Sequence, residues 1–201
     1  MKHLIFLLLL TGLINVLQGQ SFIGAWEGHE TSEDGNKIKS VVIFSDGYQV
    51  MTKYHADTGK FISTNGGTWK LDGETMTETV EFDSENPERV GTEKSFKTHI
   101  SNEKMGIVGQ DMTMNRIDAG EPGKLRGAWL MSGRIRDGEL QERDTSRPRK
   151  TMKILSGTRF QWIAYDTGTK EFKGTGGGTY STIDGKYIVS DRKGQVLIIT
   201  A

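Results

Sequence analysis

The sequence predicts an all-β protein built from two tandem antiparallel β-barrels, of which the second is incomplete or open. Three observations lead to this fold class. The 201 residues include 26 glycines and 3 prolines, a composition typical of many short strands joined by tight turns. Apolar and polar residues alternate over short runs, and no run has the apolar period of about 3.6 residues that a sizeable helix needs. A set of short motifs also occurs twice, in the same order.

The repeated motifs indicate a duplicated domain. Gly-Ala-Trp occurs at 24–26 and 127–129, Asp-Thr-Gly at 57–59 and 166–168, Phe at 61 and 172, and Gly-Gly-Thr followed by Trp or Tyr at 66–69 and 177–180. The second copy follows the first after about 100 residues, which is too long for a solenoid repeat. The spacing is slightly longer for the later motifs, so we expect a longer loop at residues 137–149 of the second copy.

The first 19 residues have the layout of a secretory signal peptide. Met1–His3 is a short basic segment, Leu4–Leu10 is an unbroken apolar run, and Gly19 is the expected last residue before cleavage. The apolar run is too short to span a membrane. We therefore expect a secreted or periplasmic protein without a membrane span; a retained N-terminal anchor is the alternative.

Charge and cysteine content exclude several partners. The chain has 26 basic and 26 acidic side chains and no cysteine. A balanced charge gives no electrostatic reason to expect nucleic acid or an anionic membrane as partner. Without cysteine there is neither a disulfide framework nor a lipid-attachment site, so the stability of the exported chain must come from its core.

Residues 20–118 are expected to form the first barrel. Its eight expected strands are 22–26, 40–44, 48–54, 61–71, 75–82, 93–100, 105–108 and 112–117. Asp-Gly pairs at 46–47 and 72–73 lie between alternating runs, which is a strong hairpin signal. Sequential hairpins favour an up-and-down barrel, because closure removes the exposed edges of a flat sheet.

Residues 125–201 are expected to form the second, truncated copy, after a Gly- and Pro-containing linker at 119–124. Its six expected strands lie at Trp129, 151–155, 160–165, 172–183, 187–189 and 196–199. Proteins seldom leave long strand edges bare, so we expect this half to self-associate or to bind a partner strand through the apolar run at 196–200. A truncated gene product with a disordered tail is the alternative.

The motifs resemble those of lipocalins. Gly24-Ala25-Trp26 is similar to the Gly-x-Trp of the first lipocalin strand. Together with the motif at 66–69 and the strand at 77–82, it is similar to small secreted lipocalin-like proteins of Bacteroides-type bacteria, which are largely of unknown function. The resemblance covers residues 22–118 and implies a ligand-sized interior. It also implies a structural plug in which Arg116 packs over Trp26, with Trp129 in the place of Trp26 in the second copy.

Glu78 is the leading candidate for contact with a ligand. It shares one phase of its strand with Met76, Val80 and Phe82, so it faces the barrel interior if the apolar phase does. An unpaired buried carboxylate is costly and needs a cation, hydrogen-bond donors, water or a ligand; a strand end that opens to solvent is the alternative. The other expected ligand contacts are Trp69, Leu71, Phe96 and Tyr54.

We expect no catalytic site, metal site or cofactor. The two Asp-Thr-Gly triplets are those that a bilobal aspartic protease carries, but polar neighbours make each one a hairpin tip. His29, His55 and His99 lack the close sequence pairing of a zinc motif. Gly174–Gly178 precedes no helix that would bind phosphate.

Two function classes follow. The leading hypothesis is an exported, non-enzymatic protein that binds a small apolar or amphipathic ligand in the first barrel. The alternative is a protein–protein interaction module that uses the open second sheet, and a hydrolase is a remote third. The size of the barrel cavity separates the first two, because a ligand needs a hollow of several hundred cubic ångströms.

Overall fold

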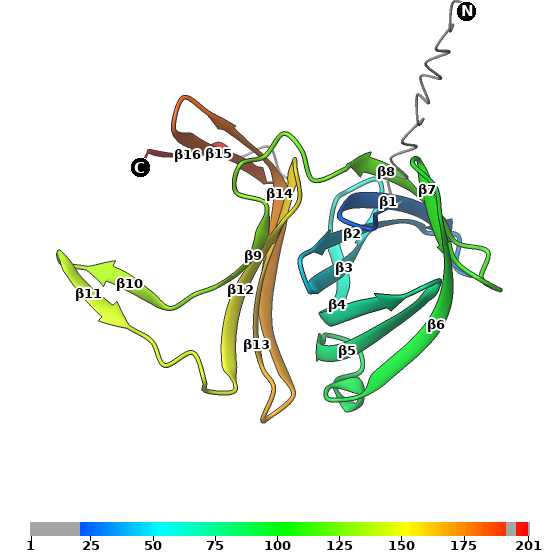
Figure 1. The fold of residues 1–201 in the computed structure, drawn as a ribbon, viewed down its shortest axis with the longest axis horizontal. Coiled ribbons are helices and arrows are strands. Elements are labelled where there is room, and N and C mark those ends of the chain that lie inside the picture. The colour runs from blue at the N-terminus through cyan, green and yellow to red at the C-terminus, as the bar shows by residue number, and fades with distance from the viewer. Residues whose placement is uncertain (1–20, 192–195, 201) are drawn as a thin grey trace, which may run out of the picture.

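The first half of the protein is a closed antiparallel barrel in the computed structural model, which describes residues 21–191 and 196–200. Its eight strands follow chain order, and β8 pairs back onto β1. They are β1 (Gly24–Thr31), β2 (Lys37–Ser45), β3 (Tyr48–His55), β4 (Phe61–Asp72), β5 (Thr75–Asp83), β6 (Glu93–Ile100), β7 (Lys104–Ile107) and β8 (Thr113–Asp118). The all-β class and the closed first barrel are therefore confirmed (Figure 1). One short 3₁₀ turn, η1 (Pro87–Arg89), lies between β5 and β6.

The second half is an open six-stranded sheet. Its strands are β9 (Gly127–Leu130), β12 (Arg149–Leu155), β13 (Arg159–Asp166), β14 (Glu171–Ile183), β15 (Lys186–Asp191) and β16 (Val196–Thr200). They are arranged in the order β16-β15-β14-β13-β12-β9, so β16 and β9 form the two edges. The expected adhesive run forms the edge strand β16, which pairs with β15 on its other side. No helix in the described residues is long and apolar enough to cross a membrane.

The prediction of a longer loop at 137–149 is wrong in part, because this segment contains a strand. β10 (Gly133–Arg136) and β11 (Glu139–Glu142) pair as a separate hairpin, which projects from the second sheet (Figure 1). Asp137 and Gly138 connect them with φ angles of 52° and 81°, the left-handed pair that a tight hairpin turn requires. This Asp-Gly pair is the same signal that located hairpins in the first half.

Strands β2 and β3 are buried on both faces. On β2, Val42 and Phe44 join the cluster inside the barrel, while Ile43 points outward and packs in a cluster with Ile154 and Ile163 of the second sheet. A strand with one solvated face alternates polar and apolar residues, whereas a strand covered on both faces carries an unbroken apolar run. The contact between the barrel and the second sheet therefore explains the unbroken apolar run at 41–44.

Aromatic and polar contacts complete this seam between the barrel and the second sheet. Phe61 and Phe172 stack with ring centroids 6.1 Å apart and an interplanar angle of 13°. Tyr54 donates a hydrogen bond to Gln161 at 3.1 Å, and Tyr165 donates one to a carboxylate of the barrel. Each fully buried apolar side chain contributes about 1.5–3 kcal/mol, so the barrel and the sheet stabilise each other.

Asp118 joins the end of the barrel to the second sheet. Its buried carboxylate accepts hydrogen bonds from Ser156 Oγ at 2.9 Å and from the backbone N–H groups of Gly157 and Thr158 at 3.0 Å each. Thr158 Oγ1 at 2.6 Å and the N–H of Gly120 at 2.9 Å are further donors. One carboxylate at the end of β8 thus fixes the turn between β12 and β13.

Trp26 plugs the barrel as the sequence predicts. Its side chain is fully buried, and its Nε1 donates a hydrogen bond to the carbonyl of Phe22 at 2.8 Å. Arg116 lies over the ring with its Cζ 4.0 Å from the ring centroid. The same guanidinium donates to the carbonyls of Ile23 and Ser21. Trp26 and Arg116 therefore close the N-terminal end of the barrel together.

The second plug expected at Trp129 is wrong. Trp129 repeats the local geometry of Trp26, since its Nε1 donates to the carbonyl of Leu125 at 2.9 Å. Its side chain is nevertheless 55% exposed. The open sheet has no strands equivalent to β7 and β8 within the described residues, so nothing covers this ring from the other side.

We expect Trp26→Ala to lower the free energy of unfolding by about 3–5 kcal/mol, because it empties a large aromatic site in the core. Chemical denaturation followed by circular dichroism measures this loss. Trp129→Ala is the matched control and should cost less than about 1 kcal/mol, since the ring is already half exposed. An equal loss in the two variants would contradict the plug.

Candidate functional site

The barrel encloses a cavity of about 500 Å³. Small-molecule sites have volumes of about 300–1,000 Å³, so the cavity has the size of a ligand site. Most of its wall is apolar, and five of the lining side chains are methionines, at 51, 76, 105, 112 and 114. Methionine is flexible and polarisable, which suits a wall that adapts to the shape of its occupant.

An aromatic cluster closes one end of this cavity. Trp69 packs edge-on against Phe44 and Phe22, with ring centroids 5.2 and 6.3 Å away. Its Nε1 donates hydrogen bonds to the carbonyls of Ser45 and Tyr48 at 3.0 Å each. Trp69 thus ties β4 to the turn between β2 and β3 and forms the floor of the barrel rather than a cavity wall.

Polar side chains line the cavity along its length. Lys53, Arg89, Lys94 and Gln110 lie toward the opposite end, where β3 passes into β4 and β5 into β6. Asn65 and Glu78 lie midway along β4 and β5, and Gln49 and Thr98 lie nearer the floor. Two of the cations already hold a carboxylate: Lys53 pairs with Glu30 at 2.8 Å, and Arg89 pairs with the buried Asp83 at 2.7 Å. The cavity therefore combines an apolar body with a polar mouth.

Only part of the hydrogen-bonding capacity of the Arg89 guanidinium is satisfied at this mouth of the cavity. Its NH1 bonds to Asp83, whose carboxylate is held in turn by the backbone N–H groups of Glu85 and Asn86. The Nε of Arg89 is buried and has no hydrogen-bond partner among the described residues. A buried unpaired donor costs about 1–3 kcal/mol, and this N–H lies beneath the surface of the cavity, where an occupant does not reach it.

Glu78 is the one carboxylate of the cavity lining. It lies on β5 between Trp69 of β4 and Lys94 of β6 in the strand register. Burial raises the pKa of Glu78 to about 7, and the positive charge of Arg89 opposes this rise. Within the described part of the chain, no group donates a hydrogen bond to this carboxylate. Glu78 therefore changes its charge near neutral pH and lacks a protein partner.

The structure brings two of the five expected ligand contacts to the cavity and places the other three elsewhere. Glu78 and Phe96 line it. Trp69 forms the floor, and Leu71 is 39% exposed near the end of β4. Tyr54 is fully buried but faces the seam, where it bonds to Gln161. The outer phase of β3 is apolar because the second sheet covers it, so alternation alone predicts the wrong face for Tyr54.

The opposite phase of β3 supplies the lining that sequence reasoning missed. Gln49, Met51 and Lys53 point into the cavity, although this phase is the more polar of the two. On β5 a bulge opposite Gly66 and Gly67 interrupts the alternation after Val80. Phe82 therefore leaves the interior phase and packs in the seam cluster instead.

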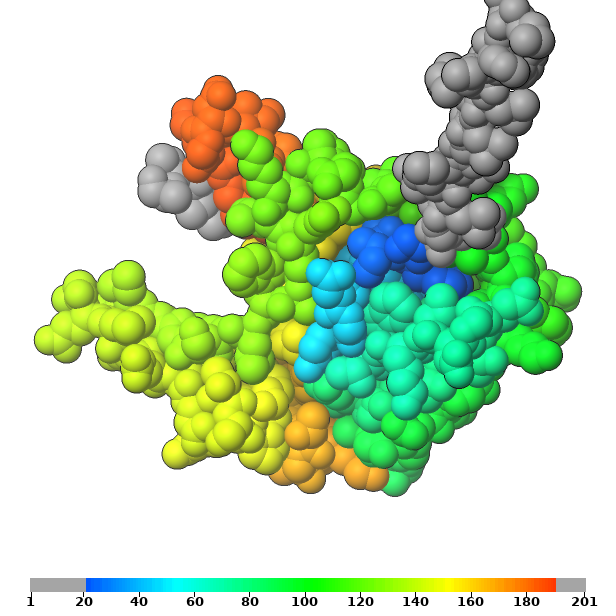
Figure 2. Space-filling view, in the orientation of Figure 1, coloured from blue at the N-terminus to red at the C-terminus, as the bar shows by residue number. Residues whose placement is uncertain are grey.

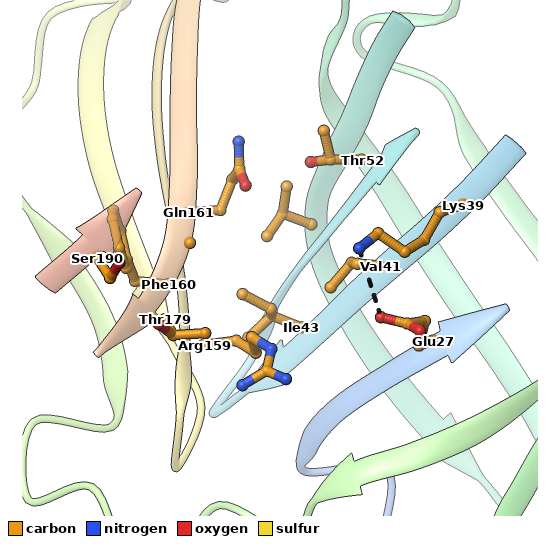
Figure 3. A pocket seen from close by; sticks show the side chains of 12 residues that line it. Glu27, Lys39, Val41, Ile43, Thr52, Arg159, Phe160, Gln161, Thr179 and Ser190 are labelled. Atoms are coloured by element: carbon orange, nitrogen blue, oxygen red, sulfur yellow. Dashed lines mark ion pairs between the residues drawn. The ribbon is translucent and has the colours of Figure 1, made fainter. Parts of the chain in front are cut away.

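A second, smaller pocket of about 150 Å³ lies in the seam itself. Figure 3 shows side chains from both halves facing it, among them Lys39 of the barrel and Arg159 of the second sheet. Glu27 lies 3.9 Å from Lys39 and 2.9 Å from the ring of His29, so its charge is matched within the barrel. The pocket is smaller than ordinary ligand sites, and we interpret it as a packing gap of the seam.

The described residues contain no group of three or more His, Asp or Glu side chains that would hold a metal ion. Comparison of the chain with protein-family models, with curated proteins and with solved structures gives no match. The geometry of the barrel cavity therefore carries the functional argument.

We expect the stability difference between Glu78→Gln and the wild type to depend on pH. The pKa of Glu78 is raised from 4.5 to about 7, so the folded state binds this proton more tightly than the unfolded chain. The resulting stabilisation is complete below about pH 4.5 and is lost as the pH rises through about 7. The melting temperature of the variant should therefore rise relative to the wild type between about pH 5 and about pH 8.

Thermal unfolding across this pH range measures the effect. Glu93→Gln is the matched control, because Glu93 is exposed at the start of β6 and should show no such trend. A difference between Glu78→Gln and the wild type that stays constant with pH would mean that the carboxylate is fully solvated.

Proposed function

We propose that the protein is an exported, non-enzymatic binding protein of lipocalin-like type that holds a small amphipathic ligand inside the barrel. The observation that carries this proposal is the cavity of about 500 Å³ with its methionine-rich wall and polar mouth. An apolar tail would lie among Met76, Met105 and Phe96, with its polar head near Glu78 and Arg89. Such a division of apolar and polar lining is typical of sites for small molecules.

We also propose that the second sheet is an incomplete copy of the barrel. Its strand order β9-β12-β13-β14-β15-β16 parallels the order β1 to β6. Ala25 pairs with Ile43 in the barrel as Ala128 pairs with Ile154 in the sheet. A register shift occurs at the same point of each copy, just before Tyr54 pairs with Phe61 and before Tyr165 pairs with Phe172.

The two halves also share details of hydrogen bonding and packing. Trp69 donates to the carbonyl of Ser45, and Tyr180 donates to the carbonyl of Ser156. The stacked pair Phe61 and Phe172 is made of residues at equivalent positions. Equivalent outer faces thus pack against each other, as in an isologous interface between two subunits. A duplication in which one copy kept the cavity and the other lost closure accounts for these likenesses.

We expect Met51→Trp to weaken the binding of an apolar probe by roughly tenfold, which is about 1.4 kcal/mol. Met51 lines the cavity from β3, so the added bulk takes up the space of the occupant. Titration with the neutral fluorophore N-phenyl-1-naphthylamine measures the affinity. Lys97→Trp is the matched control, because Lys97 of β6 is exposed and does not line the cavity.

Equal affinities of the two variants and the wild type would place the probe outside the barrel. Native mass spectrometry of the protein purified from its own host is the second measurement. A co-purifying small molecule that is lost in Met51→Trp supports the proposal, whereas failure of the wild type to bind the probe contradicts it.

A specific observation also favours the alternative, an interaction through the second sheet. Large apolar side chains are exposed there: Trp129 at 55%, Trp162 at 37%, and Ile135 and Leu140 at 77% and 65% on the projecting hairpin. Figure 2 shows this hairpin standing away from the body of the protein. Contiguous exposed apolar surface is typical of sites for self-association or for partner binding.

We expect the mature chain to self-associate at tens of micromolar if this surface is adhesive. Size-exclusion chromatography with light scattering measures the mass, and Ile135→Ser combined with Leu140→Ser should return the protein to a monomer. These residues are exposed on the hairpin and make no contact with the barrel cluster, so the fold should persist. A wild type that is monomeric at these concentrations rules out self-association.

A further inference from the structure

The edge strand β9 of the second sheet lacks a neighbour that the equivalent strand of the barrel has. In the barrel, β1 pairs with β2 on one side and with β8 on the other, and Arg116 of β8 lies opposite Trp26. Among the described residues, β9 pairs with β12 alone. The ring of Trp129 is held by the same hydrogen bond to the carbonyl four residues earlier as the ring of Trp26. Trp129 therefore lacks only the neighbouring strand and the cation that cover Trp26.

Alternate backbone groups of β9 face away from β12. The N–H of Met131 donates to the carbonyl of Thr151, and β9 pairs with β12 in this register back to Gly127. Successive residues of an antiparallel strand direct their N–H and C=O groups to opposite sides. The backbone groups of Ala128 and Leu130 therefore point to the open side, where a strand like β8 would pair.

The same free edge continues along β10. The carbonyl of Ser132 accepts a hydrogen bond from the N–H of Arg143, and β10 pairs with β11 beyond this point. The backbone groups of Gly133 and Ile135 therefore face away from β11. Because β11 and β12 are successive strands of the returning chain, residues 127–136 present one continuous edge. Proteins seldom leave such an edge without a partner strand.

A second copy of the chain offers an edge that matches this one. Two such segments pair antiparallel about a two-fold axis, which makes the contact isologous. One register brings all four free positions together, with Ala128 opposite Ile135 of the second copy and Leu130 opposite Gly133 of the second copy. A register displaced by two residues leaves some of these backbone groups unpaired.

The same register places a cation on each bare indole ring. Trp129 lies opposite Arg134 of the second copy, as Trp26 lies opposite Arg116 in the barrel. Residues directly opposite each other share a face of the sheet. Arg134 is exposed, donates a hydrogen bond to Gln141 at 3.0 Å and pairs with no carboxylate in the described part of the chain. A guanidinium over a tryptophan ring is attractive, and the contact occurs twice in such a dimer.

We propose that the protein forms a two-fold dimer in which the β9–β10 edges of two copies pair antiparallel and Arg134 of each copy packs on Trp129 of the other. This inference rests on the self-association proposed for the second sheet and adds the paired edge and its register to it. It does not depend on ligand binding in the barrel.

Disulfide trapping tests the register, because the chain contains no cysteine. Opposite residues of a hydrogen-bonded pair have Cα atoms about 5.5 Å apart, which is within disulfide range. A mixture of Ala128→Cys and Ile135→Cys mature chains should therefore give a disulfide-linked heterodimer under mild oxidation, whereas neither variant alone should link to itself. Leu140→Cys is the matched control for Ile135→Cys and should not link to Ala128→Cys, since Leu140 is exposed opposite Ile135 on the inner strand β11.

Substitution of Arg134 measures the contribution of the cation. Arg134→Ala should raise the dissociation constant of the dimer by about tenfold, because two cation–π contacts are lost. Sedimentation equilibrium of the mature chain measures this constant. Arg136→Ala is the matched control, since Arg136 is exposed on the same strand and lies opposite Gly127 in this register. In a Trp129→Ala background, Arg134→Ala should have no further effect.

The outcomes separate the edge pairing from self-association in general. A dimer that gives no cross-link between the Ala128→Cys and Ile135→Cys chains, or that is insensitive to Arg134→Ala, overturns the edge pairing, although self-association of the second sheet would stand. A wild-type chain that stays monomeric at tens of micromolar overturns both.

Discussion

The contact between the outer face of the barrel and the second sheet is the constraint on which the rest of the structure depends. On the outer face of the barrel, the side chains of Ile43, Val50 and Phe82 point outward. They form one buried cluster with Ile154 and Ile163 of the second sheet. Since burial of apolar area is the main source of stability, this seam gives the protein a core outside the barrel. Asp118 locks the same contact through its bonds to the turn between β12 and β13.

A core outside the barrel leaves the interior free for another use. The interior of an eight-stranded barrel is just wide enough to be filled by side chains or to hold one small ligand. Here Trp26 and the floor around Trp69 fill one end, and the other end remains a cavity with charged groups at its mouth. The buried cluster of the seam adds to the cluster inside the barrel, and this packing offsets the cost of the polar groups Glu78 and Arg89 in the cavity lining. The outer face of β2 and β3 thus carries the packing of the seam, while the inner face borders the cavity.

This arrangement explains which of the sequence-based predictions agree with the structure at individual residues. The strands, the hairpin turns, the closed first barrel and the Trp26 plug with Arg116 were all predictable, because they depend on local alternation, on Asp-Gly turns and on a recurring motif. Glu78 and Phe96, two of the expected ligand contacts, line the cavity. Tyr54 and Leu71 lie outside it, and Trp129 forms no second plug, since the cover of these faces is decided by a distant part of the chain.

The sequence by itself determined which residues form strands, where the strands turn and which neighbours point to opposite faces. These properties depend on a few adjacent residues and on the two-residue period of a strand. Only the tertiary structure decided which face of β3 is the interior, because both faces are buried and alternation alone cannot tell a seam from a cavity. The second sheet packs against the apolar phase of β3, which carries Val50 and Tyr54. The opposite phase, which carries Met51 and Lys53, therefore lines the cavity.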